Sequence, residues 1–196
     1  MTDDVRGHRA VSSWLLWSLA FLSFPIAGLV GLATVERVDS PAAALLGGMT
    51  TGAVIGAAQW LVSRGRLRPL RWIAATSLGM GLGLLLGASA VGFGTSLGDL
   101  ATMGALTGAI LGAGQALVLP ARGSRRWWWA AGMPVLWSLG WVVTTLAGIA
   151  VEKQFTIFGM SGAATFTGLS GWLLYWVLRR RPAPQVSPIS PAGGAA

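Results

Sequence analysis

The sequence predicts an all-α integral membrane protein, a six-helix bundle built from three tandem helical-hairpin repeats related by a pseudo-threefold axis along the membrane normal. Three observations predict it: an apolar composition, six long apolar stretches, and a motif that recurs every 56 residues. Hydrophobic types make up 54% of the 196 residues, another 29 residues are glycine, and only 10% are charged. A soluble domain has about 25% charged residues, so this composition indicates a membrane protein.

Six stretches are long enough to cross a bilayer, which takes about 20 apolar residues for roughly 30 Å of hydrocarbon. None carries Asp, Glu, Lys or Arg in its middle. They are residues 11–35, 42–62, 72–91, 100–119, 127–150 and 155–178. The first is too long for the 7–15-residue core of a cleaved signal peptide, so we expect it to be retained. We therefore expect a cytoplasmic N-terminal segment at 1–10, a transmembrane domain at 11–181 and a disordered Pro/Gly/Ala tail at 182–196.

Capping residues and prolines agree with these boundaries. Ser40 followed by Pro41 is typical of an N-cap and a first helical turn. Pro120 ends the fourth span because proline cannot continue the hydrogen-bond ladder. Pro25 and Pro134 fall inside the first and fifth spans, where we expect kinks.

The arginines predict the orientation of the chain. Twelve of the 14 Lys and Arg residues fall on one side, and the other side has only Arg37 and Lys153. The positive-inside rule then places both termini in the cytoplasm, and the Gly, Ala, Arg and Trp bias fits a bacterial inner membrane. The +8 net charge therefore requires no nucleic acid. Ten of these arginines are also candidate contacts for anionic lipids: Arg64, Arg66, Arg68, Arg71, Arg122, Arg125, Arg126, Arg179, Arg180 and Arg181.

Nine of the 11 tryptophans lie near the predicted cytoplasmic ends of the spans. An indole has an apolar body and one N–H donor and favours the headgroup level, so we expect an interfacial belt rather than ligand stacking. The nine are Trp14, Trp17, Trp60, Trp72, Trp127, Trp128, Trp129, Trp172 and Trp176.

The internal repeat is the strongest signal in the sequence. Residues 51–62 read TGAVIGAAQWLV, and residues 107–118 read TGAILGAGQALV. A further 56 residues along, Gly168 matches Gly56 and Gly112. The repeats are hairpins at about 11–63, 70–119 and 126–179, and two crossings per hairpin give every copy the same orientation.

The pattern Gly-x-x-x-Gly-x-x-Gln-Trp-Leu-Val of residues 52–62, followed by basic residues and a Trp-led helix, resembles uncharacterised multi-pass bacterial membrane proteins. The resemblance covers about residues 44–178. It implies a membrane location and a helical fold and carries no activity. The third copy departs from the pattern because Gly171 replaces the glutamine.

Glycines recur every four residues along three spans, and the sixth span keeps a weaker version. Small residues at this spacing let helices approach closely in a membrane, so we interpret them as the central seam of the bundle. A self-association surface, or a groove for a lipid or a partner helix, is the alternative. The helix-packing glycines are Gly48, Gly52, Gly56, Gly79, Gly83, Gly87, Gly104, Gly108, Gly112 and Gly168.

Gln59 and Gln115 follow the last glycine of their stripes by three residues and lie in the cytoplasmic third of their spans. A buried amide must find hydrogen-bond partners. We interpret both as interhelical hydrogen bonds, with a polar intramembrane site near the cytoplasmic mouth as the alternative.

We expect no enzymatic activity, cofactor or metal. Gly159-Met160-Ser161-Gly162 is similar to the serine motif of rhomboid proteases, but His8 is the one histidine and belongs to the opposite side. Asp99 is expected to cap the fourth span. No Asp, Glu or His lies within a span, as a proton relay requires.

The first functional hypothesis is a non-catalytic bundle that binds or scaffolds membrane proteins or lipids. The second is a passive channel or facilitator for a small neutral solute or lipid, and the third is a lipid-modifying enzyme. The ligand, the partner and the oligomeric state do not follow from the sequence.

Overall fold

The computed structural model describes residues 13–121 and 123–178, and every regular element in this part of the chain is helical. The predicted segments 1–10 and 182–196 lie outside the described residues, as do Arg122 and Arg179, Arg180 and Arg181. The elements are η1 (Leu19–Leu22), α2 (Ser23–Val35), α3 (Pro41–Val62), α4 (Pro69–Ala90), α5 (Leu97–Val118), α6 (Arg125–Leu146), η2 (Val151–Lys153) and α7 (Met160–Leu178).

Five helices of the described chain are long and apolar enough to cross a membrane. They are Ser13–Val35, which includes η1 and α2, and the four helices α3, α4, α5 and α6. Their boundaries agree within four residues with the first five predicted spans. This part of the sequence prediction is confirmed.

Local sequence explains where these helices begin. The Ser40 side chain accepts a hydrogen bond from the Ala43 backbone N–H, as an N-cap does. The N-cap of α5 is Ser96 rather than Asp99, and Asp99 is the third helical residue of a reciprocal capping box. Near Pro25, η1 interrupts the α-helix, because proline has no N–H for the carbonyl four residues earlier.

The sixth predicted span differs from the helix found in the structure. The helix α7 has 19 residues and begins at Met160, five residues later than expected, and it is not among the five long apolar helices. Gln154 adopts a left-handed conformation with φ of 53°, and residues 155–159 are non-helical. The side chains of Thr156, Ile157 and Phe158 are buried in the bundle.

The buried segment reaches an aromatic cluster in the interior. Ring centroids of Trp137 and Phe158 lie 4.7 Å apart, and those of Phe24 and Phe158 lie 5.3 Å apart. Non-helical backbone at membrane depth is tolerated where protein surrounds it. The Gly159 N–H donates to Thr144 Oγ1, which fixes the start of α7 against α6.

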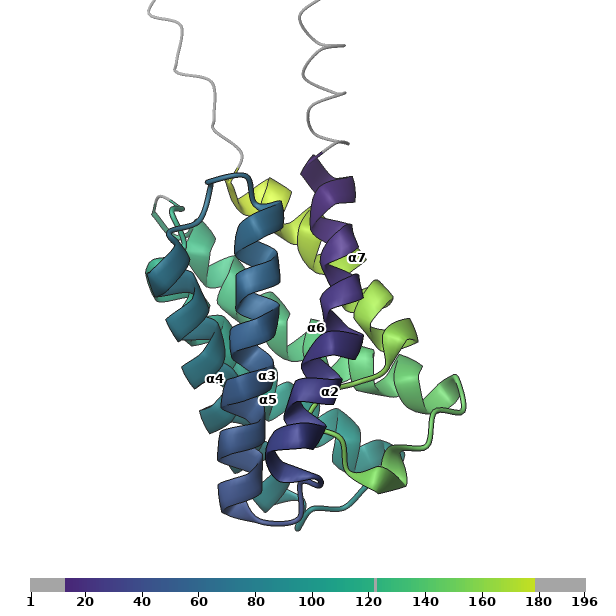
Figure 1. The fold of residues 1–196 in the computed structure, drawn as a ribbon. Helices are drawn as coiled ribbons and strands as arrows, with labels where there is room; N and C mark the ends of the chain where they lie inside the picture. The colour runs from purple at the N-terminus through teal and green to yellow at the C-terminus, as the bar shows by residue number, and fades with distance from the viewer. Residues whose placement is uncertain (1–12, 122, 179–196) are drawn as a thin grey trace, which may run out of the picture.

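Helices that follow one another in the sequence pack together, and α7 returns to contact η1 and α2, which closes the bundle (Figure 1). The turns after α3 and α5 and the C-terminal end of α7 share one end of the molecule (Figure 1). We call it the arginine end, because Arg64, Arg66, Arg68 and Arg125 lie there. Asp39 and Asp99 lie at the opposite end, at the other termini of α3 and α5.

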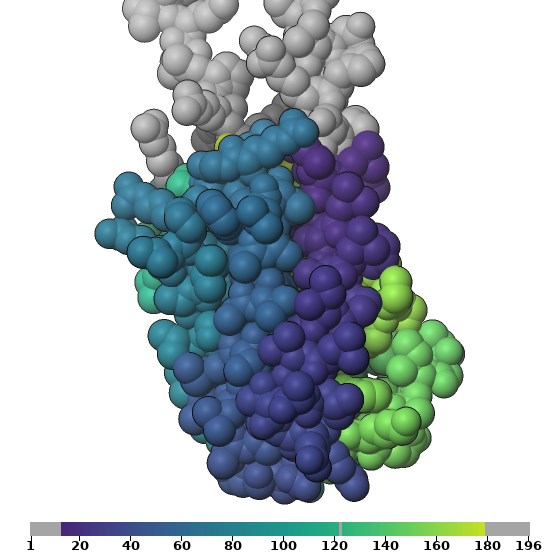
Figure 2. Space-filling view, in the orientation of Figure 1, coloured from purple at the N-terminus to yellow at the C-terminus, as the bar shows by residue number. Residues whose placement is uncertain are grey.

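The outer face of the first span is apolar. Leu19, Leu22, Ile26 and Leu29 are 50–67% exposed and recur every three or four residues along one side of the helix. The space-filling view shows this span lying directly against α3 (Figure 2). An exposed apolar stripe of this kind suits a helix whose outward face meets lipid.

Candidate functional site

Three tryptophans meet in the interior near the arginine end. Trp17 of the first span, Trp72 of α4 and Trp129 of α6 are no more than 3% exposed. Their ring centroids lie 6.4 Å (Trp17–Trp72), 6.4 Å (Trp17–Trp129) and 6.2 Å (Trp72–Trp129) apart. We call these three residues the tryptophan layer. Trp17 meets both other rings edge to face, and such pairs add stability beyond the area they bury.

Each indole N–H of the tryptophan layer donates to a side chain of a neighbouring helix. Trp72 donates to Gln59 Oε1 over 3.1 Å, and Trp129 donates to Gln115 Oε1 over 3.0 Å. Trp17 donates to Ser170 Oγ of α7 over 3.1 Å. The three N–H groups are therefore satisfied without water, as buried tryptophans require.

The tryptophan belt expected from the sequence is wrong for these three residues. They face inward. Each indole N–H already has an acceptor on a neighbouring helix, so it does not need a hydrogen bond in the headgroup region. Residues 17, 72 and 129 are separated by nearly one repeat length, but Trp14, Trp72 and Trp128 fit that length as well, so spacing alone does not identify the buried set. Other members are exposed by 37–63%, as a belt requires: Trp14, Trp127, Trp128, Trp172 and Trp176.

The structure places Gln59 and Gln115 inside the bundle, each 1% exposed. Besides the bond from Trp129, the Nε2 of Gln115 donates to Thr76 Oγ1 over 2.9 Å. Thr76 Oγ1 in turn donates to the Trp72 carbonyl. The amides thus link α3 to α4 and α5 to both α4 and α6, which is what interhelical hydrogen bonds do.

The glycine stripes lie at three separate helix contacts. Those of α3 face α4, those of α4 face α5, and those of α5 face α6. A Cβ at Gly52 would lie 2.7 Å from the Thr76 carbonyl oxygen, and a Cβ at Gly83 would lie 2.8 Å from the Thr107 Cα. The single central seam expected from the sequence is therefore replaced by a series of pairwise contacts around the bundle.

Gly168 differs from the other predicted packing glycines. A Cβ at this position would meet nothing within 4 Å, so the glycine is not needed for a close approach. The tight positions of α7 are Gly162, where a Cβ would collide with the Gly140 carbonyl oxygen of α6, and Gly171, where a Cβ would lie 2.7 Å from Trp17 Cδ1. The packing role expected for Gly168 therefore falls to Gly162 and Gly171, where α7 makes its close contacts.

The described arginines of the candidate lipid-contact set stand at the arginine end. Arg64, Arg66, Arg68 and Arg71 are exposed. The guanidinium of Arg125 lies 5.7 Å from the Trp176 ring centroid, and that of Arg126 lies 5.4 Å from the Trp127 centroid. Such cation–π contacts hold arginine heads beside the exposed tryptophans.

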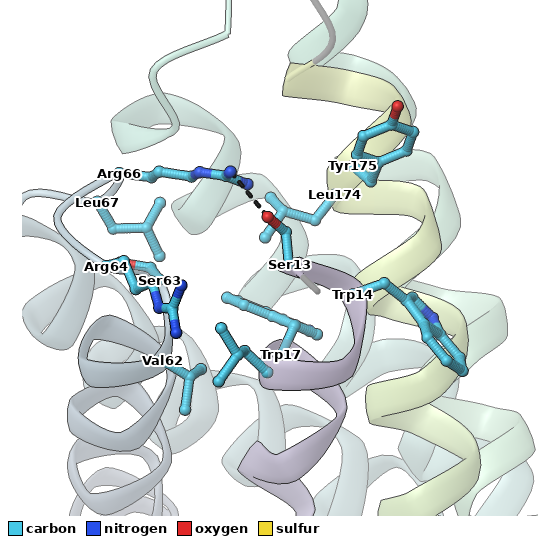
Figure 3. A pocket seen from close by; sticks show the side chains of 12 residues that line it. Ser13, Trp14, Trp17, Val62, Ser63, Arg64, Arg66, Leu67, Leu174 and Tyr175 are labelled. Atoms are coloured by element: carbon cyan, nitrogen blue, oxygen red, sulfur yellow. Dashed lines mark hydrogen bonds between the residues drawn. The ribbon is translucent and has the colours of Figure 1, made fainter. Parts of the chain in front are cut away.

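A cleft opens at this end between the first span, the turn after α3 and α7 (Figure 3). Its volume is about 30 Å³. Arg66 reaches across it and donates to Ser13 Oγ over 2.8 Å, while Leu174 lies beside Ser13 and Trp17 lies below (Figure 3). A smaller cavity of about 20 Å³ at the opposite end is lined by Phe93, Gln154 and their neighbours. Neither cavity is lined by Gln59 or Gln115.

The described residues contain no group of three or more His, Cys, Asp or Glu side chains that could hold a metal ion. Ser161 Oγ is buried at the start of α7, and the described chain gives it no hydrogen-bond partner and hence no general base. Compared with known proteins, the chain matches no family model, no curated protein and no solved structure.

Proposed function

We propose that this protein is a non-catalytic multi-pass bundle of the bacterial cytoplasmic membrane that binds or scaffolds other membrane proteins or lipids. The observation that supports it most is the filled axis. The tryptophan layer occupies the interior near one end, and Phe24, Phe158 and Trp137 occupy the middle. A packed interior leaves the outer surface and the ends as the places where a partner can bind.

We also propose that the bundle consists of three equivalent hairpins. The support is the triangle of tryptophans, in which Trp72 pairs with Gln59 and Trp129 pairs with Gln115 at matching repeat positions. In the third copy Ser170 takes the acceptor role beside Gly171, where the glutamine is missing. A repeated donor–acceptor pair of this kind is expected when one hairpin is used three times.

The runner-up, a passive channel for a small neutral solute, requires a path along the axis. It is tested by reconstituting the protein in liposomes and following glycerol entry by stopped-flow light scattering. We expect the rate of empty vesicles, because the side chains of the tryptophan layer are in ring contact and have no unpaired N–H to line a polar path. Faster entry that the pair Gln59→Leu and Gln115→Leu abolishes would establish the channel and overturn the packed-bundle proposal.

Binding is tested by purification in a mild detergent followed by mass spectrometry of whatever is retained. We expect the same lipid or membrane protein to be recovered in repeated preparations. Repeated recovery of the bare protein would count against a binding or scaffolding role. A detergent-solubilised helical membrane protein of similar size serves as the control for nonspecific carry-over.

A further inference from the structure

We propose that the cleft between the first span, the turn after α3 and α7 is a binding site for the phosphate of an anionic phospholipid. The inference rests on the proposed function and names the ligand class for one place on the molecule. Arg64 and Arg66 supply the charge, and the hydroxyl group of Ser13 also lines the cleft. The remaining walls are mainly apolar, with Trp17 and Leu174 among them.

The charge around the cleft favours an anion. None of the described residues that line it carries a carboxylate. The acidic residues of the described chain, Glu36, Asp39, Asp99 and Glu152, all follow or precede the helix termini at the opposite end. Two guanidinium groups beside one cleft, with the nearest described carboxylates a helix length away, produce a local positive potential.

The arginine geometry fits a phosphate. The hydrogen bond from Arg66 Nη2 to Ser13 Oγ holds the guanidinium over the cleft (Figure 3). A guanidinium has five N–H groups in a fixed planar fork, so the bond to Ser13 leaves others to donate to phosphate oxygens. Arg64 stands on the same turn and also lines the cleft, so one phosphate can accept from both.

The apolar surroundings favour a lipid over a free phosphate ion. The cleft volume of about 30 Å³ admits about two water-sized groups, so phosphate oxygens enter while the rest of the ligand stays outside. The apolar lining includes Leu16 and Leu174, together with Trp14 of the first span, which is 37% exposed. Acyl chains can follow these apolar surfaces, which a free ion cannot use, and tryptophans favour the headgroup level.

The test is native mass spectrometry of the full chain in mild detergent, titrated with phosphatidylglycerol or with the matching diacylglycerol, which lacks the phosphate. The cleft variant carries Arg64→Gln and Arg66→Gln. The matched control carries Arg68→Gln and Arg71→Gln, which removes the same charge from the same end without touching the cleft lining. We expect the cleft variant to lose about tenfold more affinity for phosphatidylglycerol than the control, because charge-assisted hydrogen bonds are lost along with the charge.

A second variant separates geometry from charge. Arg64→Lys with Arg66→Lys keeps both charges but loses the planar fork, and we expect it to bind phosphatidylglycerol more weakly than the wild type. Circular dichroism and thermal unfolding establish that each variant is folded. The difference between the cleft variant and the control should persist at 0.5 M salt, where interactions of exposed charges are largely screened, with a Debye length of about 4 Å.

Three results would overturn the proposal. They are equal losses in the two glutamine pairs, equal binding of the diacylglycerol, and displacement of phosphatidylglycerol by millimolar inorganic phosphate, which would make the ligand a free anion. The proposed function fails separately, through solute flux in the liposome assay. Flux together with cleft-dependent lipid binding would overturn the packed bundle and leave the lipid site intact.

Discussion

At the scale of the residue, Gln115 joins three helices through its amide. Its Oε1 accepts from Trp129 of α6, and its Nε2 donates to Thr76 of α4. In Gln115→Leu the indole N–H of Trp129 stays buried without an acceptor. We expect the free energy of unfolding to fall by about 1–2 kcal/mol. This value lies between the free energy that a typical hydrogen bond contributes in a membrane protein and the free-energy cost of leaving a buried donor unsatisfied. Unfolding in a mild detergent by titration with sodium dodecyl sulfate, followed by circular dichroism, measures it.

A double-mutant cycle identifies the bond responsible for the loss. Trp129→Phe removes the N–H donor, so Gln115→Leu in that background should cost less than it does in the wild type. Additive effects would show that the glutamine acts through packing and not through the bond to Trp129. Thr76→Val in place of Trp129→Phe measures the contribution of the second hydrogen bond in the same way.

The residue scale also shows where sequence reasoning stops. The sequence identified Gln59 and Gln115 as buried amides that need partners, and the structure supplies those partners. It did not identify the partners, because Trp17 and Trp129 lie close to exposed tryptophans along the chain. Trp17 is 3% exposed and Trp14 is 37% exposed, yet both precede the same apolar stretch. Residues three apart lie on nearly the same side of a helix, and amphipathicity within a lipid-facing span is too weak to show which of the two is buried.

At the scale of the element, Gly108 of α5 and Gly168 of α7 each belong to a stripe of small residues four positions apart. Their surroundings differ. A Cβ at Gly108 would collide with the Met133 carbonyl oxygen of α6, and a Cβ at Gly168 would meet nothing within 4 Å. We expect Gly108→Ala to force α5 and α6 apart and cost about 1–3 kcal/mol, as overpacking does. Gly168→Ala should be neutral or stabilising by up to about 1 kcal/mol, because alanine favours the helix.

Both alanine variants are compared by the midpoint of unfolding in sodium dodecyl sulfate. Equal midpoints for the two would contradict the close α5–α6 contact. Gly52→Ala, which would bring a Cβ to 2.7 Å from the Thr76 carbonyl oxygen, extends the test to the contact between α3 and α4. If it too lowers the midpoint, the stripes act as pairwise helix contacts around the bundle.

The helix α7 is the element that the sequence predicted least well. Phe155, Ile157 and Phe158 are apolar, so the hydropathy of residues 155–159 resembles the start of a span. Ile157 and Phe158 are buried because they belong to a non-helical segment that enters the bundle, and not because they begin a membrane span. Thr156 Oγ1 lies 2.9 Å from Thr51 Oγ1, a hydrogen bond across 105 positions of the chain that no local pattern can indicate. Hydropathy reports how apolar a segment is, and it does not distinguish lipid from protein as the surroundings.

At the scale of the whole molecule, the arginine end and the opposite end predict a definite topology across the membrane. The chain has no cysteine, so single cysteines can be placed freely. Arg68→Cys and Ser124→Cys lie at exposed positions at the arginine end, and Gly98→Cys lies at an exposed position at the opposite end. A Cβ at Gly98 has its nearest neighbour at 3.9 Å, so this substitution leaves the packing intact.

The positive-inside rule places the arginine end in the cytoplasm. A membrane-impermeant maleimide applied to intact spheroplasts should therefore label Gly98→Cys and leave Arg68→Cys and Ser124→Cys unmodified, and inverted vesicles should give the reverse pattern. Asp39→Cys, at the same end as Gly98, should follow Gly98→Cys and controls for local accessibility. Labelling of Arg68→Cys and Gly98→Cys from the same side would mean that α4 and the turn after it do not cross the bilayer. Labelling of Arg68→Cys in intact spheroplasts would place the cleft arginines at the outer leaflet, and labelling only in inverted vesicles places them at the cytoplasmic leaflet, so this measurement decides which leaflet must supply the phosphate.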